Sequence, residues 1–365
     1  MKKNEPDNLQ LIAEEYRHAY EFLAASEELK SFRENVGDFM SPTPRYKVYQ
    51  EHSVTLYRYR RATPSSYRYP LLIVPSLVNK PAIMDLLKGQ SFIAAMLQRE
   101  LDVFMLEWGS PTPGQKHYRL DFYLNNYLAR AVRRTMRASG AAGVSLGGYC
   151  LGGTLSLLFA ACDGGRRVKS LIPMVAPVDF EDRGLLSWWA REEHFDVDKL
   201  VDTTGNITAE FFTGIFPWLV PAGKLKQMRT LYKKHRDPEF LKSFFALDVW
   251  ISENIPFPGQ VYREIIKNGY QKNSLVKKRS WSLGSREARL ADLSMPVFAL
   301  AALFDHVSPV ESCTALGDLL EKHPDCTVTA YQTGHLGIAL GKDPRNKPTA
   351  LYWDDIAAWL KERDL

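Results

Sequence analysis

The sequence predicts an α/β fold in which a doubly wound, mostly parallel sheet carries an inserted cap. Short apolar runs of the kind found in buried parallel strands alternate with helical patterns along most of the chain. This alternation stops after residue 180 and resumes near residue 292, and aromatic and basic residues accumulate in between. We therefore expect an N-terminal helical arm over residues 1–45, a core built from residues 46–180 and 292–365, and an inserted cap over residues 181–291.

The N-terminal arm shows an amphipathic helical pattern over residues 7–38. Its apolar positions recur at spacings of mostly three and four, as on one face of a helix, and they include Leu9, Ile12, Tyr16, Tyr20 and Leu23. Such a stripe usually packs against another surface. That surface is either the core of the same chain or a second subunit, and the sequence leaves both open. The stretch Ser41-Pro42-Thr43-Pro44 separates the arm from the core.

The core begins with two strands and continues as alternating strands and helices. Residues 46–60 alternate apolar and polar positions around a turn near Glu51 and His52, which predicts a strand pair. Buried strands are expected at Tyr69–Leu77, Val103–Trp108, Gly143–Cys150, Leu171–Val178, Val297–Asp305 and Cys326–Tyr331. Helices are expected at Ile83–Arg99, Phe122–Ser139, Thr154–Cys162, Val310–Lys322 and Ala350–Glu362. A site would lie at the carboxyl edge of such a sheet, under the cap.

The composition argues against several classes of protein. A chain of 365 residues with 45% hydrophobic content can bury a sizeable core, and a net charge of +5 is too small to indicate nucleic-acid binding. Its four cysteines form no Cys-x-x-Cys pair, so neither a metal site nor a disulfide framework is expected. We find no nucleotide-binding glycine motif, no secretory signal and no apolar run of the ~20 residues that span a bilayer. We therefore expect a cytoplasmic protein without a cofactor.

The most informative motif is Gly148-Tyr149-Cys150-Leu151-Gly152, which follows an apolar run and precedes a compact helical pattern. This is the frame of a nucleophile elbow, the strained strand-to-helix turn of the α/β-hydrolase fold, with cysteine where most hydrolases carry serine. The elbow holds the nucleophile in front of the sheet. A thiol favours exchange with thioesters, and cysteine is a strong nucleophile once it is partly ionised.

A second box overlaps the first, because Gly143-Val144-Ser145-Leu146-Gly147 also matches the hydrolase pattern. An elbow at Ser145 would place two glycines inside the following helix, where each costs about 1 kcal/mol relative to alanine. It would also leave Ala138–Ala142 as the central strand, without a single β-branched or large apolar residue. We therefore assign the elbow to Cys150 and place Ser145 within the strand.

Two further residues complete a catalytic set in the chain order expected for this fold, which is nucleophile, acid and histidine. Asp305 ends the strand that begins at Val297, and His335 lies on the glycine-flanked loop after the last strand. We expect His335 to accept the proton of Cys150 while Asp305 orients the imidazole. His306 is a rival base and a possible accessory residue, but adjacent residues at a strand end point in different directions.

Two backbone N–H groups are expected to stabilise the oxyanion. One is that of Leu151, directly after the nucleophile, and the other lies in the loop Pro75–Lys80, where Val78 is the best candidate. A basic stretch in the cap has two interpretations, a solvated helix face or a contact for the phosphates of coenzyme A. It consists of Lys224, Lys226, Arg229, Lys233, Lys234 and Arg236.

With these groups in place, the sequence resembles the polyhydroxyalkanoate synthases over nearly its whole length. The box that runs from Gly148 to Thr154, with its trailing Gly-Gly-Thr, is quite specific to that family. Other matching segments are Leu56–Tyr59, Pro75–Lys80, Leu106–Gly109, Val178–Phe180, Trp250, Pro256–Gly259, Asn273–Leu275, Asp305–His306 and Gly334–His335. Ser308 and Glu107 depart from the residues more common in the family, which bears on the subfamily more than on activity.

The short N-terminal region resembles that of the small catalytic subunit of two-subunit synthases, class III or class IV. This resemblance implies that (R)-3-hydroxyacyl-CoA, such as 3-hydroxybutyryl-CoA, is polymerised into polyester with release of coenzyme A through an acyl thioester on Cys150. It also implies a second subunit of the PhaE or PhaR type, a homodimer, and association with the polyester granule. Asp305 is either the orienting acid or a base toward the 3-hydroxyl.

Two other functions compete with synthesis. An intracellular polyester depolymerase or an acyl-CoA thioesterase would use the same triad with water as the acceptor. A non-catalytic protein that coats granules through the N-terminal arm has no need of three catalytic groups in order, so we set that hypothesis aside.

Overall fold

The computed structural model of the chain describes residues 17, 21–22, 25–341 and 351–364. These residues form a central 8-stranded sheet in the order β1-β2-β6-β3-β7-β8-β11-β12. Its strands are β1 (Arg45–Glu51), β2 (Val54–Tyr59), β6 (Val103–Glu107), β3 (Leu71–Val74), β7 (Val144–Tyr149), β8 (Val168–Met174), β11 (Val297–Ala302) and β12 (Cys326–Tyr331). β1 and β6 both pair antiparallel with β2, whereas every pair from β6 to β12 is parallel. The mostly parallel sheet expected from the sequence is confirmed.

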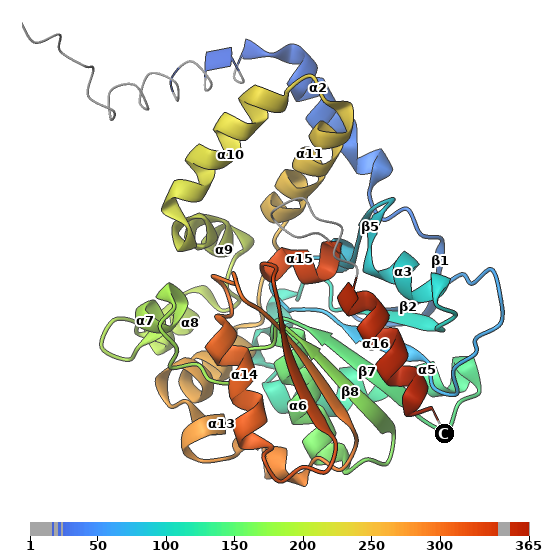
Figure 1. Cartoon of the computed structure of the whole chain (residues 1–365). Coiled ribbons are helices and arrows are strands. Elements are labelled where there is room, and N and C mark those ends of the chain that lie inside the picture. The colour runs from blue at the N-terminus through green and yellow to red at the C-terminus, as the bar shows by residue number, and fades with distance from the viewer. Residues whose placement is uncertain (1–16, 18–20, 23–24, 342–350, 365) are drawn as a thin grey trace, which may run out of the picture.

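Helices cover both faces of this sheet (Figure 1). One face carries α4 (Leu120–Phe122), the π-helical segment η4 (Tyr123–Leu128), α5 (Ala129–Ser139), α6 (Leu151–Asp163) and α14 (Val310–Leu319). The other face carries α3 (Phe92–Gln98), α15 (His335–Leu340) and α16 (Leu351–Glu362). A short 3-10 helix, η3 (Pro113–His117), precedes α4.

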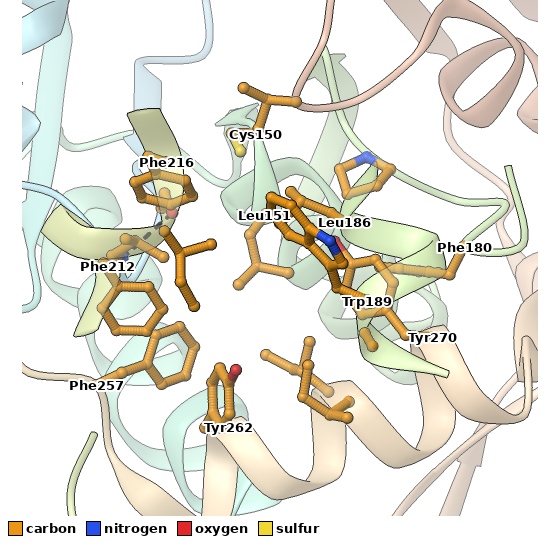
Figure 2. Close-up of a pocket in the computed structure, with 18 of the residues that line it drawn as sticks. Cys150, Leu151, Phe180, Leu186, Trp189, Phe212, Phe216, Phe257, Tyr262 and Tyr270 are labelled. Carbon is orange, nitrogen blue, oxygen red and sulfur yellow. Dashed lines mark hydrogen bonds between the residues drawn. The ribbon is translucent and has the colours of Figure 1, made fainter. Parts of the chain in front are cut away.

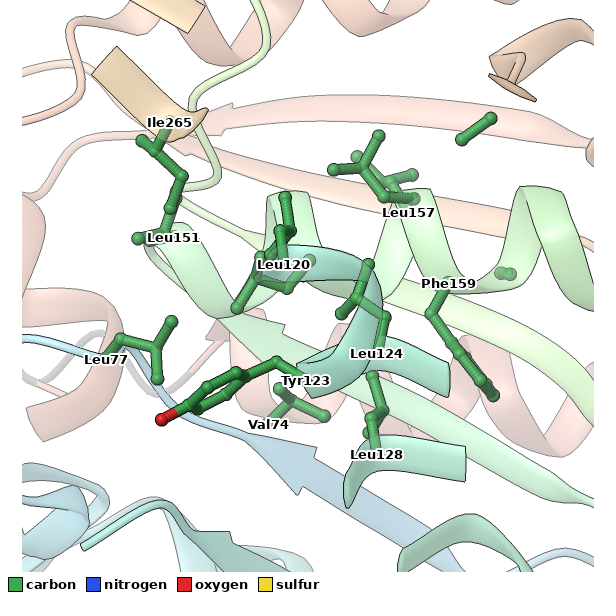
Figure 3. Close-up of a cluster of buried hydrophobic side chains, with 14 of the residues drawn as sticks. Val74, Leu77, Leu120, Tyr123, Leu124, Leu128, Leu151, Leu157, Phe159 and Ile265 are labelled. Carbon is green, nitrogen blue, oxygen red and sulfur yellow. The ribbon is translucent and has the colours of Figure 1, made fainter. Parts of the chain in front are cut away.

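The strands are apolar on both faces because both faces are covered. In β3, Leu72 and Val74 point into one hydrophobic cluster, while Leu71 and Ile73 point into the other, and all four are fully buried. Figure 3 shows the first cluster, in which leucines of η4 lie beside Val74 and those of α6. Burial of each such side chain contributes about 1.5–3 kcal/mol. This rigid two-sided core fixes the position of the strand ends.

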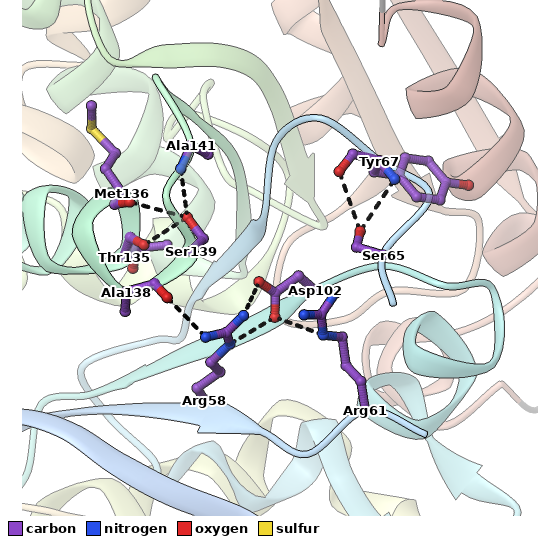
Figure 4. Close-up of polar contacts among 10 residues, drawn as sticks. All are labelled: Arg58, Arg61, Ser65, Tyr67, Asp102, Thr135, Met136, Ala138, Ser139 and Ala141. Atoms are coloured by element: carbon purple, nitrogen blue, oxygen red, sulfur yellow. Dashed lines mark hydrogen bonds and ion pairs between the residues drawn. The ribbon is translucent and has the colours of Figure 1, made fainter. Parts of the chain in front are cut away.

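An ion pair with a buried carboxylate ties the antiparallel edge to the parallel part of the sheet. The guanidinium of Arg58 in β2 donates to both carboxylate oxygens of Asp102, at 3.0 and 2.8 Å, and to the carbonyl of Ala138 at 2.8 Å. Arg61 lies 3.4 Å from the same carboxylate (Figure 4). Such bidentate pairs are directional as well as strong. The pair therefore helps to set β2 beside the start of β6.

The segment between β8 and β11 is mainly helical. Its elements are α7 (Leu185–Ala190), α8 (Val197–Thr204), α9 (Ala209–Ile215), η5 (Phe216–Leu219), α10 (Pro221–Lys234), α11 (Pro238–Ser252), α12 (Gly259–Ile265), the π-helical η6 (Ile266–Gln271), α13 (Ser274–Lys277), β9 (Trp281–Leu283), β10 (Arg286–Ala288) and the 3-10 helix η7 (Leu290–Asp292). α10 and α11 rise side by side away from the sheet (Figure 1). The β9–β10 hairpin instead packs against α6. The exact division into arm, core and cap stays a prediction.

Part of the N-terminal arm docks on the chain itself. α2 (Glu27–Asn35), capped by Ser26 and followed by the 3-10 helix η1 (Val36–Phe39), packs against α11. The ring of Phe32 lies 6.1 Å from that of Phe245, and Arg33 Nε donates to Asp248 Oδ2 at 2.7 Å. The predicted stripe of Leu9, Ile12, Tyr16, Tyr20 and Leu23 lies outside the described residues.

The helix predicted over Ile83–Arg99 is wrong in its first half. The chain instead forms the 3-10 helix η2 (Pro81–Met84) and a small hairpin of β4 (Asp85–Leu87) and β5 (Gln90–Ser91), before α3 begins at Phe92. Gly89 takes a φ of +80° at the hairpin turn. The Ser91 hydroxyl donates to Asp85 at 2.6 Å and accepts the Ala94 N–H at 2.9 Å, so it caps α3. The helix was predicted from apolar periodicity alone, which took no account of the glycine at position 89 or the capping serine at position 91.

Within the described ranges, none of the helices has the length and apolar character needed to span a bilayer.

Candidate active site

Cys150 occupies the turn between β7 and α6, as the motif predicted. Its φ of 55° and ψ of −132° lie in a region that side chains rarely adopt. Such a conformation costs about 1–3 kcal/mol and persists only where the surroundings impose it. Here the Cys150 N–H donates to the Met174 carbonyl at 2.9 Å, and the Gly153 N–H donates to the Cys150 carbonyl at 2.8 Å. These two bonds hold the elbow between β8 and the first turn of α6.

The glycines around Cys150 are required by close backbone contacts. A Cβ on Gly148 would lie 2.4 Å from the Cα of Gly153, and one on Gly152 would lie 2.2 Å from the carbonyl oxygen of Val74. Real Cβ atoms do not approach so closely, so the strand end and the helix start can meet only where both side chains are absent. Ser145, by contrast, is buried within β7, and its N–H donates to the Pro70 carbonyl at 2.9 Å. The structure therefore places no turn at Ser145.

The predicted acid and base are joined by a hydrogen bond. His335 is the first residue of α15, and its Nδ1 lies 2.7 Å from Oδ2 of Asp305, just beyond the end of β11. The other oxygen, Oδ1, accepts the N–H groups of Val307 at 2.8 Å and Ser308 at 2.9 Å. Both carboxylate oxygens are thus engaged, and the Asp305 side chain is fully buried.

The electrostatics of this pair favour a protonated imidazole. Burial alone would lower the pKa of His335, but the negative charge of Asp305 and the interaction with Cys150 outweigh burial and hold that pKa well above its ordinary value. An imidazole of this kind readily takes a proton from a neighbouring thiol. Asp305, His335 and Cys150 therefore form one interacting set, assembled from the ends of β11, β12 and β7.

The structure places the remaining predicted residues as follows. His306 is exposed, whereas Asp305 beside it is buried. Leu151 is the first residue of α6, where backbone N–H groups lack partners within the helix. The Val78 N–H donates to the Ser76 hydroxyl at 3.3 Å, and all four residues Ser76, Val78, Cys150 and Leu151 line the same cavity. The oxyanion role of Val78 stays a prediction.

A cavity of about 160 Å³ opens in front of Cys150, between the carboxyl edge of the sheet and the helices of residues 185–271. None of the described residues that line it is charged. Its aromatic walls consist of Phe180, Trp189, Phe195, Phe211, Phe212, Phe216, Phe257, Tyr262 and Tyr270. Cys150 lies at one end, and Phe257 and Tyr262 lie at the other (Figure 2). Among the described residues, no cluster of His, Cys, Asp and Glu could hold a metal ion.

Sequence reasoning missed the parts played by two tyrosines. Tyr149, within the elbow motif, donates its hydroxyl to the backbone carbonyl of His335 at 3.1 Å. Tyr262 belongs to no motif that sets it apart from the other aromatics of the cap, although it lines the far end of the cavity. The first could have been suspected from its place beside the nucleophile. The second carries no local signal, because only the packing of α12 against the core brings Tyr262 to the wall of the cavity.

Comparison with known proteins agrees with this fold. Residues 69–341 match the family model described as "alpha/beta hydrolase fold". The structure resembles a monoacylglycerol lipase from Paleococcus ferrophilus with a TM-score of 0.52 and 15% sequence identity, covering 84% of this chain and 99% of that one. The sheet, the elbow and these matches define an α/β-hydrolase.

Relatives in sequence are more specific. Residues 8–96 match the model of the N-terminus of poly-beta-hydroxybutyrate polymerase (PhaC). The chain is 36% identical to the poly(3-hydroxyalkanoate) polymerase subunit PhaC of Synechocystis, covering 94% of this chain and 90% of that protein, and 35% identical to the subunit of the same name from Allochromatium vinosum, covering 88% and 89%. The chain belongs to the family of poly(3-hydroxyalkanoate) polymerase PhaC subunits. It is therefore an enzyme of the acyltransferase class.

Proposed function

We propose that this enzyme polymerises (R)-3-hydroxyacyl-CoA, and 3-hydroxybutyryl-CoA in particular, into polyester with release of coenzyme A. The proposal assigns the nucleophile to Cys150, the base to His335 and the orienting acid to Asp305, and it requires no cofactor. One observation supports it above the others. A cysteine at a strained elbow interacts with a buried His–Asp pair and faces an uncharged, aromatic cavity.

Acylation begins when His335 takes the proton of Cys150. The thiolate attacks the carbonyl carbon of the substrate thioester, and the negative charge that develops on oxygen is stabilised by the N–H of Leu151 and by that of Val78. Val78 must then release its 3.3 Å bond to the Ser76 hydroxyl. The carbon–sulfur bond to coenzyme A breaks, and His335 returns the proton to the departing thiolate. An acyl thioester remains on Cys150.

Elongation needs a base for the 3-hydroxyl of an acyl unit, and we assign this role to His335. Both oxygens of Asp305 already accept hydrogen bonds, one from the imidazole and two from the backbone of Val307 and Ser308. A carboxylate so engaged orients a histidine better than it accepts a proton from a substrate. His335 takes the proton of the hydroxyl, the oxygen attacks a thioester carbonyl, and the carbon–sulfur bond breaks as the ester bond forms. His335 then returns the proton to the thiolate that leaves.

The aromatic cavity favours transfer to a hydroxyl over transfer to water. Its walls carry no charged side chain among the described residues, and a dry site raises the yield of an intermediate that water would otherwise destroy. A depolymerase or thioesterase would use the same three groups with water as the acceptor. No feature of the residues that the structure describes favours that alternative.

The experiment that tests the proposal measures coenzyme A release from 3-hydroxybutyryl-CoA together with the products. We expect insoluble polyester from the wild type, no coenzyme A release from a folded Cys150→Ala variant, and most activity in Ser145→Ala. Free hydroxy acid without polymer would establish hydrolysis instead. Full activity in Cys150→Ala would remove the proposed nucleophile.

The family resemblance also supports three proposals about assembly. The enzyme acts with a second subunit of the PhaE or PhaR type, forms a homodimer and associates with the surface of the polyester granule. α10 exposes several of the predicted basic residues, namely Lys226, Arg229, Lys233 and Lys234. None of these lines the cavity, so a contact with the phosphates of coenzyme A would lie outside it.

A further inference from the structure

Tyr262 carries a hydroxyl whose place in the cavity has no structural explanation. The residue lies in α12 and is 9% exposed, and its hydroxyl forms no hydrogen bond with any residue that the structure describes. In Figure 2 the hydroxyl oxygen points toward the open middle of the cavity, on the side where Cys150 lies. It is thus a donor without a protein acceptor among the described residues, aimed into the cavity from the end opposite Cys150.

The ring of Tyr262 is held in a fixed position. It makes edge contacts with Phe257 at 5.5 Å, Phe212 at 6.0 Å and Phe211 at 6.2 Å between ring centroids. Phenylalanine fills the neighbouring positions, and it would satisfy the same packing here. The hydroxyl faces the cavity, so its acceptor comes from whatever fills the cavity, which is water or a ligand. A ligand that displaces this water must supply an acceptor in its place, because a buried hydroxyl without one costs about 1–3 kcal/mol.

This group acts as a donor rather than as a base. Burial raises the pKa of Tyr262 well above the ordinary value, and no charged side chain contributes to that shift. The phenol therefore stays protonated at neutral pH. Its partner must be a neutral or anionic acceptor that fits among aromatic walls.

Charge and position restrict which part of the substrate or product can accept the hydrogen bond of the Tyr262 hydroxyl. Coenzyme A carries several phosphates, and no described residue of the cavity wall offers a positive charge to them, so the cavity suits the acyl part of the substrate. The thioester carbonyl must lie at Cys150, close to the N–H of Leu151. Tyr262 lies at the opposite end (Figure 2), where a carbonyl farther along the acyl chain would reach it.

We propose that the far end of the cavity binds the growing polyester, and that the hydroxyl of Tyr262 donates a hydrogen bond to an ester carbonyl of that chain. A polyester presents apolar methylene and side groups to the aromatic walls and a carbonyl acceptor in every unit. This binding site rests on the proposed function, because polyester is expected there only if the enzyme makes it. It assigns Tyr262 a part in holding the product chain, separate from the acylation of Cys150.

Binding is tested in the Cys150→Ala protein, which prevents turnover. The affinity for a methyl-esterified trimer of (R)-3-hydroxybutyrate is measured by calorimetry, beside that for a linear alkane of similar length, which has no hydrogen-bond acceptor. Adding Tyr262→Phe should weaken the affinity for the trimer about 2- to 10-fold, the value of one neutral hydrogen bond, and leave the affinity for the alkane unchanged. Tyr123→Phe is the matched control, since Tyr123 is a buried tyrosine of the core outside the cavity. Equal weakening of both ligands, or no change in either, overturns the proposal.

A kinetic experiment separates this proposal from the proposed function. In Tyr262→Phe with Cys150 intact, the length of the polyester chains should fall by a larger factor than the first-turnover release of coenzyme A, because the product dissociates sooner. Loss of first-turnover release in the variant would place Tyr262 in the acylation step and refute its role in holding the product chain. Absence of any acylation in the wild type would refute the proposed function, while the binding comparison would still decide the role of Tyr262.

Discussion

The hydroxyl of Tyr149 donates to the backbone carbonyl of His335 at 3.1 Å, and the two rings lie 5.3 Å apart between centroids. Tyr149 is the last residue of β7, directly before Cys150, and it is almost completely buried. The strand that carries the nucleophile thus holds the first turn of α15, which carries the base. A displacement of one element would be transmitted to the other through this single side chain.

Tyr149→Phe should therefore lower the reactivity of Cys150 more than it lowers stability. The lost hydrogen bond costs about 1 kcal/mol of unfolding free energy, whereas we expect iodoacetamide labelling of Cys150 to slow several-fold because the imidazole is less well placed. Tyr352→Phe is the control. The hydroxyl of Tyr352, in α16, donates to the carbonyl of Gly337, which lies in α15 like His335. Equal labelling rates in the two variants would assign Tyr149 a purely structural role.

His335→Gln should remove activation of the thiol and cut turnover by at least the roughly 10²-fold that a lost general base produces. His306→Gln should do much less, because His306 is exposed while His335 contacts Asp305. The measurement is the labelling rate of Cys150 by iodoacetamide in both variants at neutral pH. Slower labelling only in the His306 variant would reverse the assignment of the base.

Replacement of Cys150 by glycine should stabilise the fold while it abolishes activity. The φ of 55° strains any residue with a Cβ, and relief of that strain outweighs the greater flexibility of glycine in the unfolded chain. We expect Cys150→Gly to exceed Cys150→Ala by about 1 kcal/mol in the free energy of unfolding. Urea denaturation of the two inactive variants measures the difference, and a less stable glycine variant would show that the elbow is not strained.

Asp182, in the loop before α7, should make stability depend on pH. Burial, opposed by the Gly184 N–H and reinforced by Glu311 and Asp179, raises the pKa of Asp182 to about 6. The folded chain therefore binds this proton more tightly than the unfolded chain does, and the wild type gains stability as the pH falls from above 6 toward 4.

Asp182→Asn removes the buried charge and keeps an oxygen that can accept the Gly184 N–H. After allowance for partial exposure, we expect the variant to be more stable by about 1 kcal/mol at pH 7.5, with the difference vanishing toward pH 4. Urea unfolding of both proteins across this range checks it. A difference that is the same at every pH would show that the charge is not responsible.

The isolated enzyme should be weakly active and show a lag, and a second subunit supplied in trans should raise its rate strongly. α2 already docks on α11 through contacts such as Phe32 with Phe245 and Arg33 with Asp248. This part of the arm is thus occupied within the chain, and the predicted partner must use another surface. Full specific activity of the purified chain, with no lag and no gain from added subunits, would remove the two-subunit assignment and leave the chemistry of Cys150 intact.

Local patterns were sufficient for much of the fold and for the composition of the site. β12 has the predicted bounds, and the elbow at Cys150 was separable from Ser145 because glycine positions and strand propensity are properties of the local chain. Between Ile83 and Arg99 the apolar periodicity predicted one helix, but two local features had the stronger effect. Gly89 forms a hairpin turn, and Ser91 caps a helix that begins only at Phe92.

The sequence by itself determined which residue types are present for the chemistry and most of the order in which the strands and helices of the core follow one another, since both are written in short stretches of chain. Only the tertiary structure decided which of these groups meet. The 2.7 Å contact of His335 with Asp305 joins residues 30 positions apart, and the Tyr149 bond to His335 joins residues 186 positions apart. The packing of α12 that brings Tyr262 to the cavity likewise depends on contacts far apart along the chain. No local pattern encodes a distance of that kind, because it follows from how all the elements pack together.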